Sequence, residues 1–113
     1  MSDLPLKTKN RFIRVADTSQ IKVDEHKVIF FQNKEVVIFN EKGEFYALEN
    51  LCPHRRAPLS AGTISNGVII CPGHGARFDI QTGQGLEGPY RSHVRTYQLK
   101  VEGNHIKIAI QSS

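Results

Sequence analysis

The sequence predicts an all-β fold, a small antiparallel sandwich or barrel. Short apolar or alternating runs recur roughly every ten residues, and residues typical of turns separate them. No stretch keeps a 3.6-residue apolar period over a helical length. Short strands at this spacing are typical of sandwiches and barrels, because each strand turns back after a few residues to pair with its neighbour. The length of 113 residues fits one compact domain.

Nine runs fit short strands, and turn signals lie between most of them. In chain order the expected strands cover residues 12–15, 27–31, 35–39, 44–48, 63–65, 68–70, 77–80, 97–101 and 105–110. Asn66-Gly67 is a pair preferred in two-residue hairpins, because both positions of such a turn need a positive φ. Residues 1–10 are polar, and we expect them to form a flexible N-terminal arm that precedes a domain of residues 11–113.

Composition places the chain among ordinary globular proteins. Hydrophobic residues make up 39% and charged residues 23% of the sequence, a balance that argues against wholesale disorder. No apolar run approaches the ~20 residues that a membrane-spanning helix needs. Residues 1–7 lack the apolar centre of a signal peptide. We therefore expect a soluble, cytoplasmic protein without a membrane span.

The formal net charge is +4, from 15 basic and 11 acidic residues. Two interpretations of this charge stay open: a mildly basic, solvated surface, or steering toward an acidic partner protein. Nucleic-acid binding is not expected, because no tight cluster of Lys and Arg is interleaved with aromatic residues. Arg55, Arg56 and Arg77 lie beside the candidate site and could serve either docking or solvation.

Two loops that follow expected strands carry a candidate metal site. The first, Cys52–His54, reads Cys-Pro-His, and the second, Cys71–His74, reads Cys-Pro-Gly-His. A disulfide between the two cysteines is disfavoured in a cytosolic chain. The hairpin expected between the loops brings them together, so that each supplies one thiolate and one imidazole.

Four ligands of this kind fit two kinds of metal centre. A structural Zn²⁺ ion takes four nitrogen and sulfur ligands, and would make the protein a zinc-stabilised structural or interaction module. A binuclear iron–sulfur cluster places two irons side by side, each with two protein ligands. The second is favoured because each loop is mixed and no helix is expected. Gly73 and Gly75 permit a close backbone approach to bridging sulfides, and Pro53 and Pro72 stiffen the loops.

The two motifs resemble those of the Rieske family. Segments Cys52–Leu59 and Cys71–Asp79 carry the likeness, and Gly88–Tyr90 is similar to the proline-containing third loop that covers the cluster in that family. The resemblance implies an all-β sandwich or barrel of the Rieske (iron–sulfur protein domain) type. It also implies a cluster-binding subdomain inserted at about residues 50–80.

The resemblance further implies a one-electron carrier with one [2Fe–2S] cluster per chain, and not an enzyme. Two cysteines would bind one iron and two histidines the other, namely Cys52 and Cys71, and His54 and His74. Electrons would pass from a flavoprotein or other reductase to a terminal oxygenase or similar enzyme. The loops are also similar to those of the small subunit of NAD(P)H-dependent nitrite reductase, which stays an alternative role. We expect a monomer.

The remaining histidines, His26, His93 and His105, are isolated in the sequence and are expected to be ordinary surface or turn residues. They lack the grouping of two histidines and a carboxylate that a catalytic non-haem iron needs. The sequence has no Gly-rich phosphate-binding loop, so the chain is not expected to bind NAD(P)H or flavin itself. We therefore expect no catalytic residues.

Ala76 and Phe78 predict a reduction potential toward the low end of the Rieske range. High-potential Rieske proteins of respiratory complexes, which this site resembles, add a disulfide across the loops and tend to carry a serine and a tyrosine at these positions. Without those hydroxyl donors, fewer hydrogen bonds stabilise the more negative reduced cluster. We expect a midpoint in the lower part of the span of roughly −150 to +300 mV. A redox titration with a midpoint near the upper end would contradict this expectation.

Overall fold

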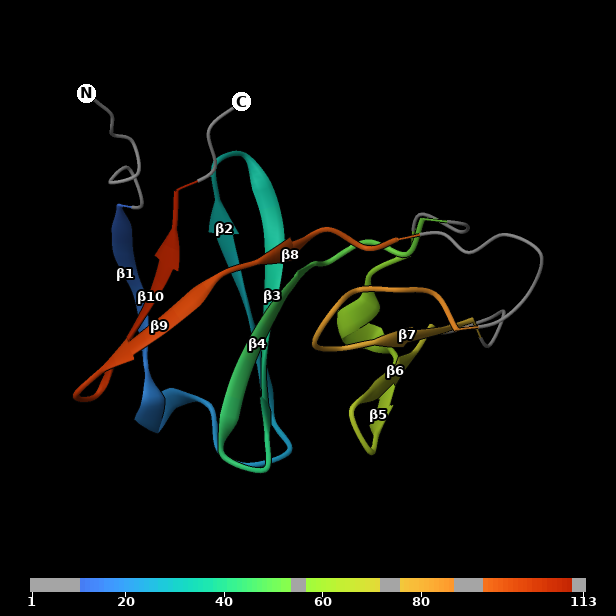
Figure 1. Ribbon diagram of the computed structural model, residues 1–113, viewed down its shortest axis with the longest axis horizontal. Helices are drawn as coiled ribbons and strands as arrows, with labels where there is room; N and C mark the ends of the chain where they lie inside the picture. The colour runs from blue at the N-terminus through green and yellow to red at the C-terminus, as the bar shows by residue number, and fades with distance from the viewer. Residues whose placement is uncertain (1–10, 54–56, 72–75, 87–92, 111–113) are drawn as a thin grey trace, which may run out of the picture.

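The computed structural model describes residues 11–53, 57–71, 76–86 and 93–110. Ten strands in these residues form three antiparallel sheets (Figure 1). The strands are β1 (Phe12–Asp17), β2 (His26–Phe31), β3 (Lys34–Glu41), β4 (Glu44–Glu49), β5 (Thr63–Ser65), β6 (Val68–Ile70), β7 (Arg77–Asp79), β8 (Thr96–Tyr97), β9 (Leu99–Glu102) and β10 (His105–Ala109). Two short 3₁₀ helices, η2 (Thr18–Gln20) and η3 (Leu59–Ala61), accompany them. Within the described residues, no helix has the length and apolarity needed to span a membrane.

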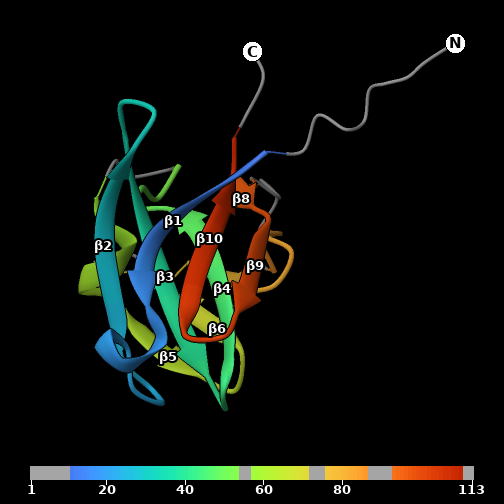
Figure 2. The same cartoon turned by 90° about the vertical axis from the view of Figure 1, so that its left-hand side faces the viewer.

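Two of the sheets pack face to face and form a sandwich (Figure 2). The first sheet has the strand order β1-β10-β9, and the second has the order β2-β3-β4-β8. Buried side chains from both sheets fill the space between them, among them Val36, Ile38, Ile106 and Ile108. This sandwich core accounts for the alternating and apolar runs of the sequence, and the prediction of an all-β antiparallel fold is confirmed.

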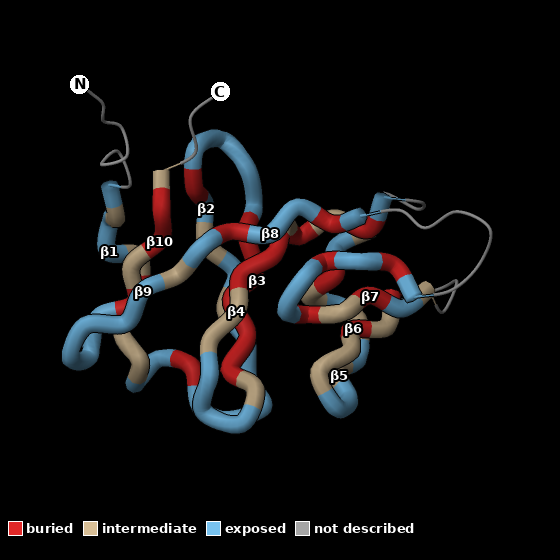
Figure 3. The backbone as a smooth tube through the Cα atoms, in the orientation of Figure 1, coloured by how far each residue is buried: buried red, intermediate tan, exposed pale blue. Residues whose placement is uncertain are grey.

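β3 lies between two cores, which explains its continuous apolar run. Alternate residues of a strand point to opposite faces of the sheet. Val36 and Ile38 point into the sandwich core, whereas Val37 and Phe39 belong to a second core, which the sheet β5-β6-β7 covers. All four side chains are buried, and β3 is correspondingly red over this stretch in Figure 3. Strands buried on both faces are apolar throughout rather than alternating.

The β5–β6 hairpin sets where the second cysteine lies. Asn66 and Gly67 have φ angles of 50° and 78° in its turn, so the hairpin predicted from this pair is confirmed. Two positive φ angles give a turn whose twist matches that of the paired strands. The register pairs Thr63 with Ile70, and β6 therefore ends directly before Cys71.

Residues 97–101, predicted to be one strand, belong to two strands in different sheets. β8 pairs with β4, whereas β9 pairs with β10. Between them the carbonyl of Gln98 accepts a hydrogen bond of 3.0 Å from the N–H of Ala109. The chain thus crosses from one sheet of the sandwich to the other without a turn signal. The two 3₁₀ helices were also not predicted, since three residues are too few to show a helical period.

Candidate metal centre

Both cysteines are buried in the second core. Cys52 follows β4 and Cys71 follows β6, and their side chains are 0% and 1% exposed. They do not form a disulfide with each other. Their neighbours in this core include Leu59, Ile69 and Phe78. The structure therefore brings both predicted thiol ligands into one apolar environment, in which an ionised thiolate needs a compensating cation.

Two loops of equal length begin at these cysteines. The N–H of Cys52 donates a hydrogen bond of 2.8 Å to the carbonyl of Ala57, and the N–H of Cys71 donates one of 2.7 Å to the carbonyl of Ala76. Each bond closes a loop of six residues that begins with Cys-Pro and ends with Ala. The equal length of the two loops does not follow from the ligand motifs, because the histidine is the third residue of one loop and the fourth of the other. Backbone closure thus gives the two thiols equivalent positions in their loops.

The other predicted ligands, His54 and His74, lie outside the described residues, as does the segment Gly88–Tyr90. Among the residues that the structure describes, no group of three or more His, Cys, Asp or Glu side chains is arranged to hold a metal ion. The structure brings together two of the four predicted ligands, and the two histidines stay a prediction. Of the other histidines, His105 lies 3.3 Å from Asp17, at the Nδ1 and Oδ1 atoms.

Close backbone packing connects the two loops. A Cβ atom on Gly62 would lie 2.1 Å from the carbonyl oxygen of Ile70, the residue before Cys71. Gly62 follows η3, so the segment that leaves the first loop packs directly on the strand that enters the second. On the far side of the hairpin, the N–H of Ile80 donates a hydrogen bond of 2.9 Å to the carbonyl of Gly67. The position of each loop therefore depends on the other.

Asn50, which the sequence analysis missed, joins the first loop to the sandwich. The residue is buried, at 6% exposure. Its Nδ2 donates to Oε1 of Glu35 over 3.1 Å, and its Oδ1 accepts from the N–H of Ser60 over 2.7 Å. The one signal in the sequence that could have identified Asn50 is its position two residues before Cys52, at the end of an apolar strand. A polar group at such a place is either exposed or hydrogen-bonded.

Two arginines close to the candidate site are exposed to solvent. Arg77, which follows the end of the second loop, is exposed, and so is Arg95. Glu49 at the end of β4 partly offsets the charge of Arg95, because its carboxylate lies 3.8 Å from Nε of Arg95. The same carboxylate lies 3.8 Å from Nζ of Lys34. Ion pairs this exposed contribute only about 0–1 kcal/mol to stability.

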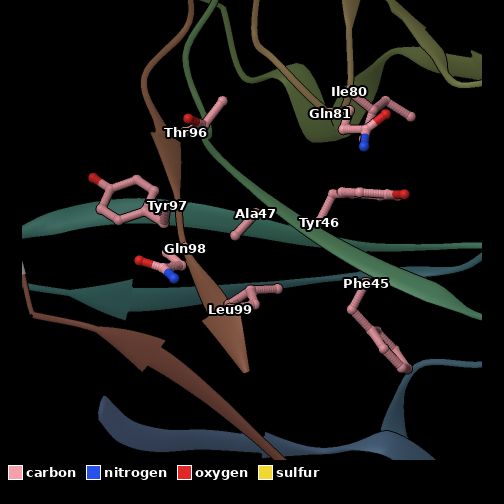
Figure 4. Close-up of a pocket in the computed structure, with 9 residues that line it drawn as sticks. All are labelled: Phe45, Tyr46, Ala47, Ile80, Gln81, Thr96, Tyr97, Gln98 and Leu99. Carbon is pink, nitrogen blue, oxygen red and sulfur yellow. The ribbon is translucent and has the colours of Figure 1, made fainter. Parts of the chain in front are cut away.

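A groove of about 340 Å³ opens between β4, β8 and the segment after β7, and neither cysteine lines it (Figure 4). The hydroxyl of Tyr46 donates to Glu44 over 2.8 Å, and this hydrogen bond raises the pKa of the phenol. Burial raises the pKa of Tyr97. Both phenols are therefore neutral at neutral pH. The groove, whose walls carry no charged side chain, is formed by Phe45, Tyr46, Ala47, Ile80, Gln81, Thr96, Tyr97, Gln98 and Leu99.

The described residues fit the thiol half of an iron–sulfur centre. Soft sulfur donors suit iron–sulfur clusters and zinc. Two thiolates buried among apolar side chains are stable only where metal cations neutralise them. Equal loops also suit a centre whose ligands come in two matching pairs. The geometry of Cys52 and Cys71 alone leaves the choice between the two metals open.

Comparison with known proteins decides the choice. The family model of the Rieske [2Fe–2S] domain matches residues 11–98. The chain belongs to the Rieske family. The ferredoxin component of the naphthalene 1,2-dioxygenase system of Pseudomonas aeruginosa is 39% identical over 77 residues, which cover 68% of this chain and 74% of that protein. The ferredoxin of carbazole 1,9a-dioxygenase from Nocardioides aromaticivorans IC177 has a similar structure, with a TM-score of 0.82 and 32% identity over 88% of this chain and 98% of that one.

A second solved structure links the fold to a protein complex. A chain of the complex of reduced oxygenase and oxidised ferredoxin in carbazole 1,9a-dioxygenase matches with a TM-score of 0.79 and 25% identity, over 87% of this Rieske chain and 92% of that one. The cofactor of this Rieske protein is thus a [2Fe–2S] cluster, which rules out the zinc-stabilised module. It is an electron-transfer ferredoxin and not itself catalytic. These relatives favour the ferredoxin role over that of a nitrite reductase subunit.

Gly62→Ala should weaken cluster retention more than Gly103→Ala. The added methyl group would displace the end of β6 next to Cys71, at a cost of about 1–3 kcal/mol. Gly103→Ala is the matched control, because Gly103 has a φ of 59° with open space around it. That substitution should cost roughly 1–2 kcal/mol through its backbone angle alone.

The two variants should differ in their iron content. After identical expression, iron and acid-labile sulfide per chain should fall in Gly62→Ala and stay at the wild-type level in Gly103→Ala. Equal cluster occupancy in both variants, at comparable losses of thermal stability, would refute the dependence of the second loop on Gly62.

Proposed function

We propose that the cluster ligands are Cys52, His54, Cys71 and His74, and that residues 50–80 serve as the cluster-binding subdomain. The observation that carries this assignment is the pair of six-residue loops, each closed by a hydrogen bond from the Cys N–H to the Ala carbonyl. Each closed loop contains one histidine between its Cys and its Ala. A loop of this size holds its ends together and leaves the intervening residues for ligation.

The chain's own residues control the environment of the metal centre. When bound, the cluster accepts and releases one electron. The burial of Cys52 and Cys71 excludes water from the sulfur ligands. Loop closure by backbone hydrogen bonds limits the rearrangement that accompanies a change of charge at the centre. Small rearrangement favours fast electron transfer, which is the requirement for a carrier.

The partners that we propose are a reductase as electron donor and the terminal oxygenase of a ring-hydroxylating dioxygenase system as acceptor. Support comes from the relatives, which include the ferredoxin component of a naphthalene 1,2-dioxygenase system and a chain from a complex of oxygenase and ferredoxin. The protein docks with the side that carries the two loops, because electron transfer requires a short path. Exposed Arg77 and Arg95 on that side favour an acidic docking surface on the partner.

Replacing the proposed histidine ligands should change the type of cluster. His54→Ala and His74→Ala should each abolish or strongly reduce cluster binding. His54→Cys combined with His74→Cys should keep iron but replace both imidazoles by thiolates. Its potential should then fall toward the ~−400 mV of clusters with four cysteine ligands. EPR spectra, metal analysis and redox titration measure these outcomes.

His105→Ala is the matched control for the ligand test, because His105 is partly exposed and paired with Asp17. It should leave the wild-type Rieske spectrum intact. A full Rieske spectrum in either His54→Ala or His74→Ala would disprove the ligand assignment.

Electron delivery should depend on positive charge near the loops. With the cognate terminal oxygenase, the bimolecular electron-transfer rate of the reduced ferredoxin should fall as salt is raised. Arg77→Glu should lower that rate several-fold at low salt, because it places a repulsive charge at the docking side. Lys22→Glu makes the same change of net charge beyond η2, on the sandwich side, and should have little effect. A rate that rises with salt, or equal effects of the two variants, would count against an acidic docking surface.

A further inference from the structure

We infer that Asn50 is a positioning residue that fixes the first cluster loop between the sandwich and η3. This inference rests on the proposed function, since it concerns the loop of a proposed ligand, Cys52. The structure gives Asn50 hydrogen bonds on both sides of that loop, in a place that solvent barely reaches. Asn50 acts through the loop, because its side-chain hydrogen bonds join Glu35 of β3 to Ser60, which follows the loop.

Asn50 is bound to β3 through one residue of that strand. Its N–H donates a hydrogen bond of 2.8 Å to the carbonyl of Glu35. Its Nδ2 donates a second, of 3.1 Å, to Oε1 of the same glutamate. β3 is the strand that lies between the two cores, so this double contact ties the start of the loop to the most buried element of the fold.

Asn50 also supplies an acceptor for one N–H group of η3 from outside the helix. The first N–H groups of a helix have no partner within the helix and need an acceptor from elsewhere. Pro58 stands at the cap position before η3, and its side chain makes no capping hydrogen bond. The Oδ1 atom of Asn50 accepts from the N–H of Ser60 instead, over 2.7 Å. Because Asn50 is only 6% exposed, water is poorly placed to replace this acceptor.

The two sets of contacts enclose the loop. Asn50 precedes Cys52, Ser60 follows Ala57, and the Cys52 N–H closes the loop onto the Ala57 carbonyl. A shift of the loop relative to β3 would break the 2.7 Å hydrogen bond from the N–H of Ser60, so Asn50 holds the Cys52 thiol in one position.

Asn40 provides a matched control within the same chain. It is the other buried asparagine among the described residues, at 7% exposure. Its Nδ2 donates to the carbonyl of Ile21 over 2.8 Å, and its Oδ1 accepts from the N–H of Gly43 over 2.9 Å. Like Asn50, it thus bridges two segments by one donated and one accepted hydrogen bond. Its contacts belong to the sandwich and not to a cysteine loop.

The first experiment compares Asn50→Ala with Asn40→Ala in the cluster-loaded protein. Both variants lose the two hydrogen bonds of a buried asparagine and should melt at a lower temperature. Only Asn50→Ala should broaden the EPR lines of the reduced cluster and release iron to a chelator faster, by roughly tenfold for the loss of one buried acceptor. Equal iron-release rates and equal linewidths in the two variants would overturn the inference.

The second experiment reverses the direction of the hydrogen bond to Glu35. Asn50→Asp keeps an acceptor for Ser60 but sets two carboxylates against each other, and should release iron faster than wild type. Adding Glu35→Gln restores one hydrogen bond, in which the amide at position 35 donates to the carboxylate at position 50. It also returns the net charge to that of wild type. The double variant should recover the wild-type release rate and linewidth, while Glu35→Gln alone should change neither.

The outcomes separate this inference from the proposed function. Failure of the wild-type protein to show a Rieske EPR signal would reject the proposed function itself. A normal wild-type signal with no recovery in the double variant would reject the positioning role of Asn50 alone. Recovery in the double variant, with Asn40→Ala unaffected in iron release, supports it.

Discussion

Burial of β3 on both faces is the constraint on which the rest of the structure depends. One face of the strand completes the sandwich, and the other forms the floor of the core that contains both cysteines. The two cores therefore share one strand, and a displacement of β3 would disturb both. This arrangement also explains why polar contacts to the loops start from β3. Glu35, at its exposed end, supplies the backbone and side-chain acceptors for Asn50.

The strands could be predicted because their signals are local. Asn66-Gly67 marks a hairpin by its backbone angles, and the apolar run of β3 marks a strand by its composition. The passage of the chain between sheets at Gln98 could not be predicted, because alternation is the same whichever sheet a strand joins. Sheet membership depends on partners distant in sequence, such as the Ala109 N–H that binds the Gln98 carbonyl.

In the candidate site, too, features with a local sequence signal could be predicted, whereas contacts made by the backbone or with distant residues could not. The cysteines were identifiable from their spacing to nearby histidines, and their burial agrees with ligation. The closure of both loops at Ala57 and Ala76 was not identifiable, because alanine carries no side-chain signal and the bonds are made by the backbone. Asn50 escaped notice for a different reason. Its function is defined by Ser60, a residue beyond the loop, and one sequence does not reveal such a pairing.

Loop closure and cluster binding reinforce each other energetically. The sheet β5-β6-β7 consists of strands of three residues each, and strands so short need an apolar surface to pack on. That surface is the outer face of β3 and β4, and the two thiols lie within the contact. A metal centre that binds the folded form stabilises it by mass action, so it also stabilises the packing of the small sheet. Conversely, each contact that fixes the sheet, such as the approach of Gly62 to Ile70, preorganises the thiols of the two proposed ligands and would lower the entropy lost when they bind the cluster.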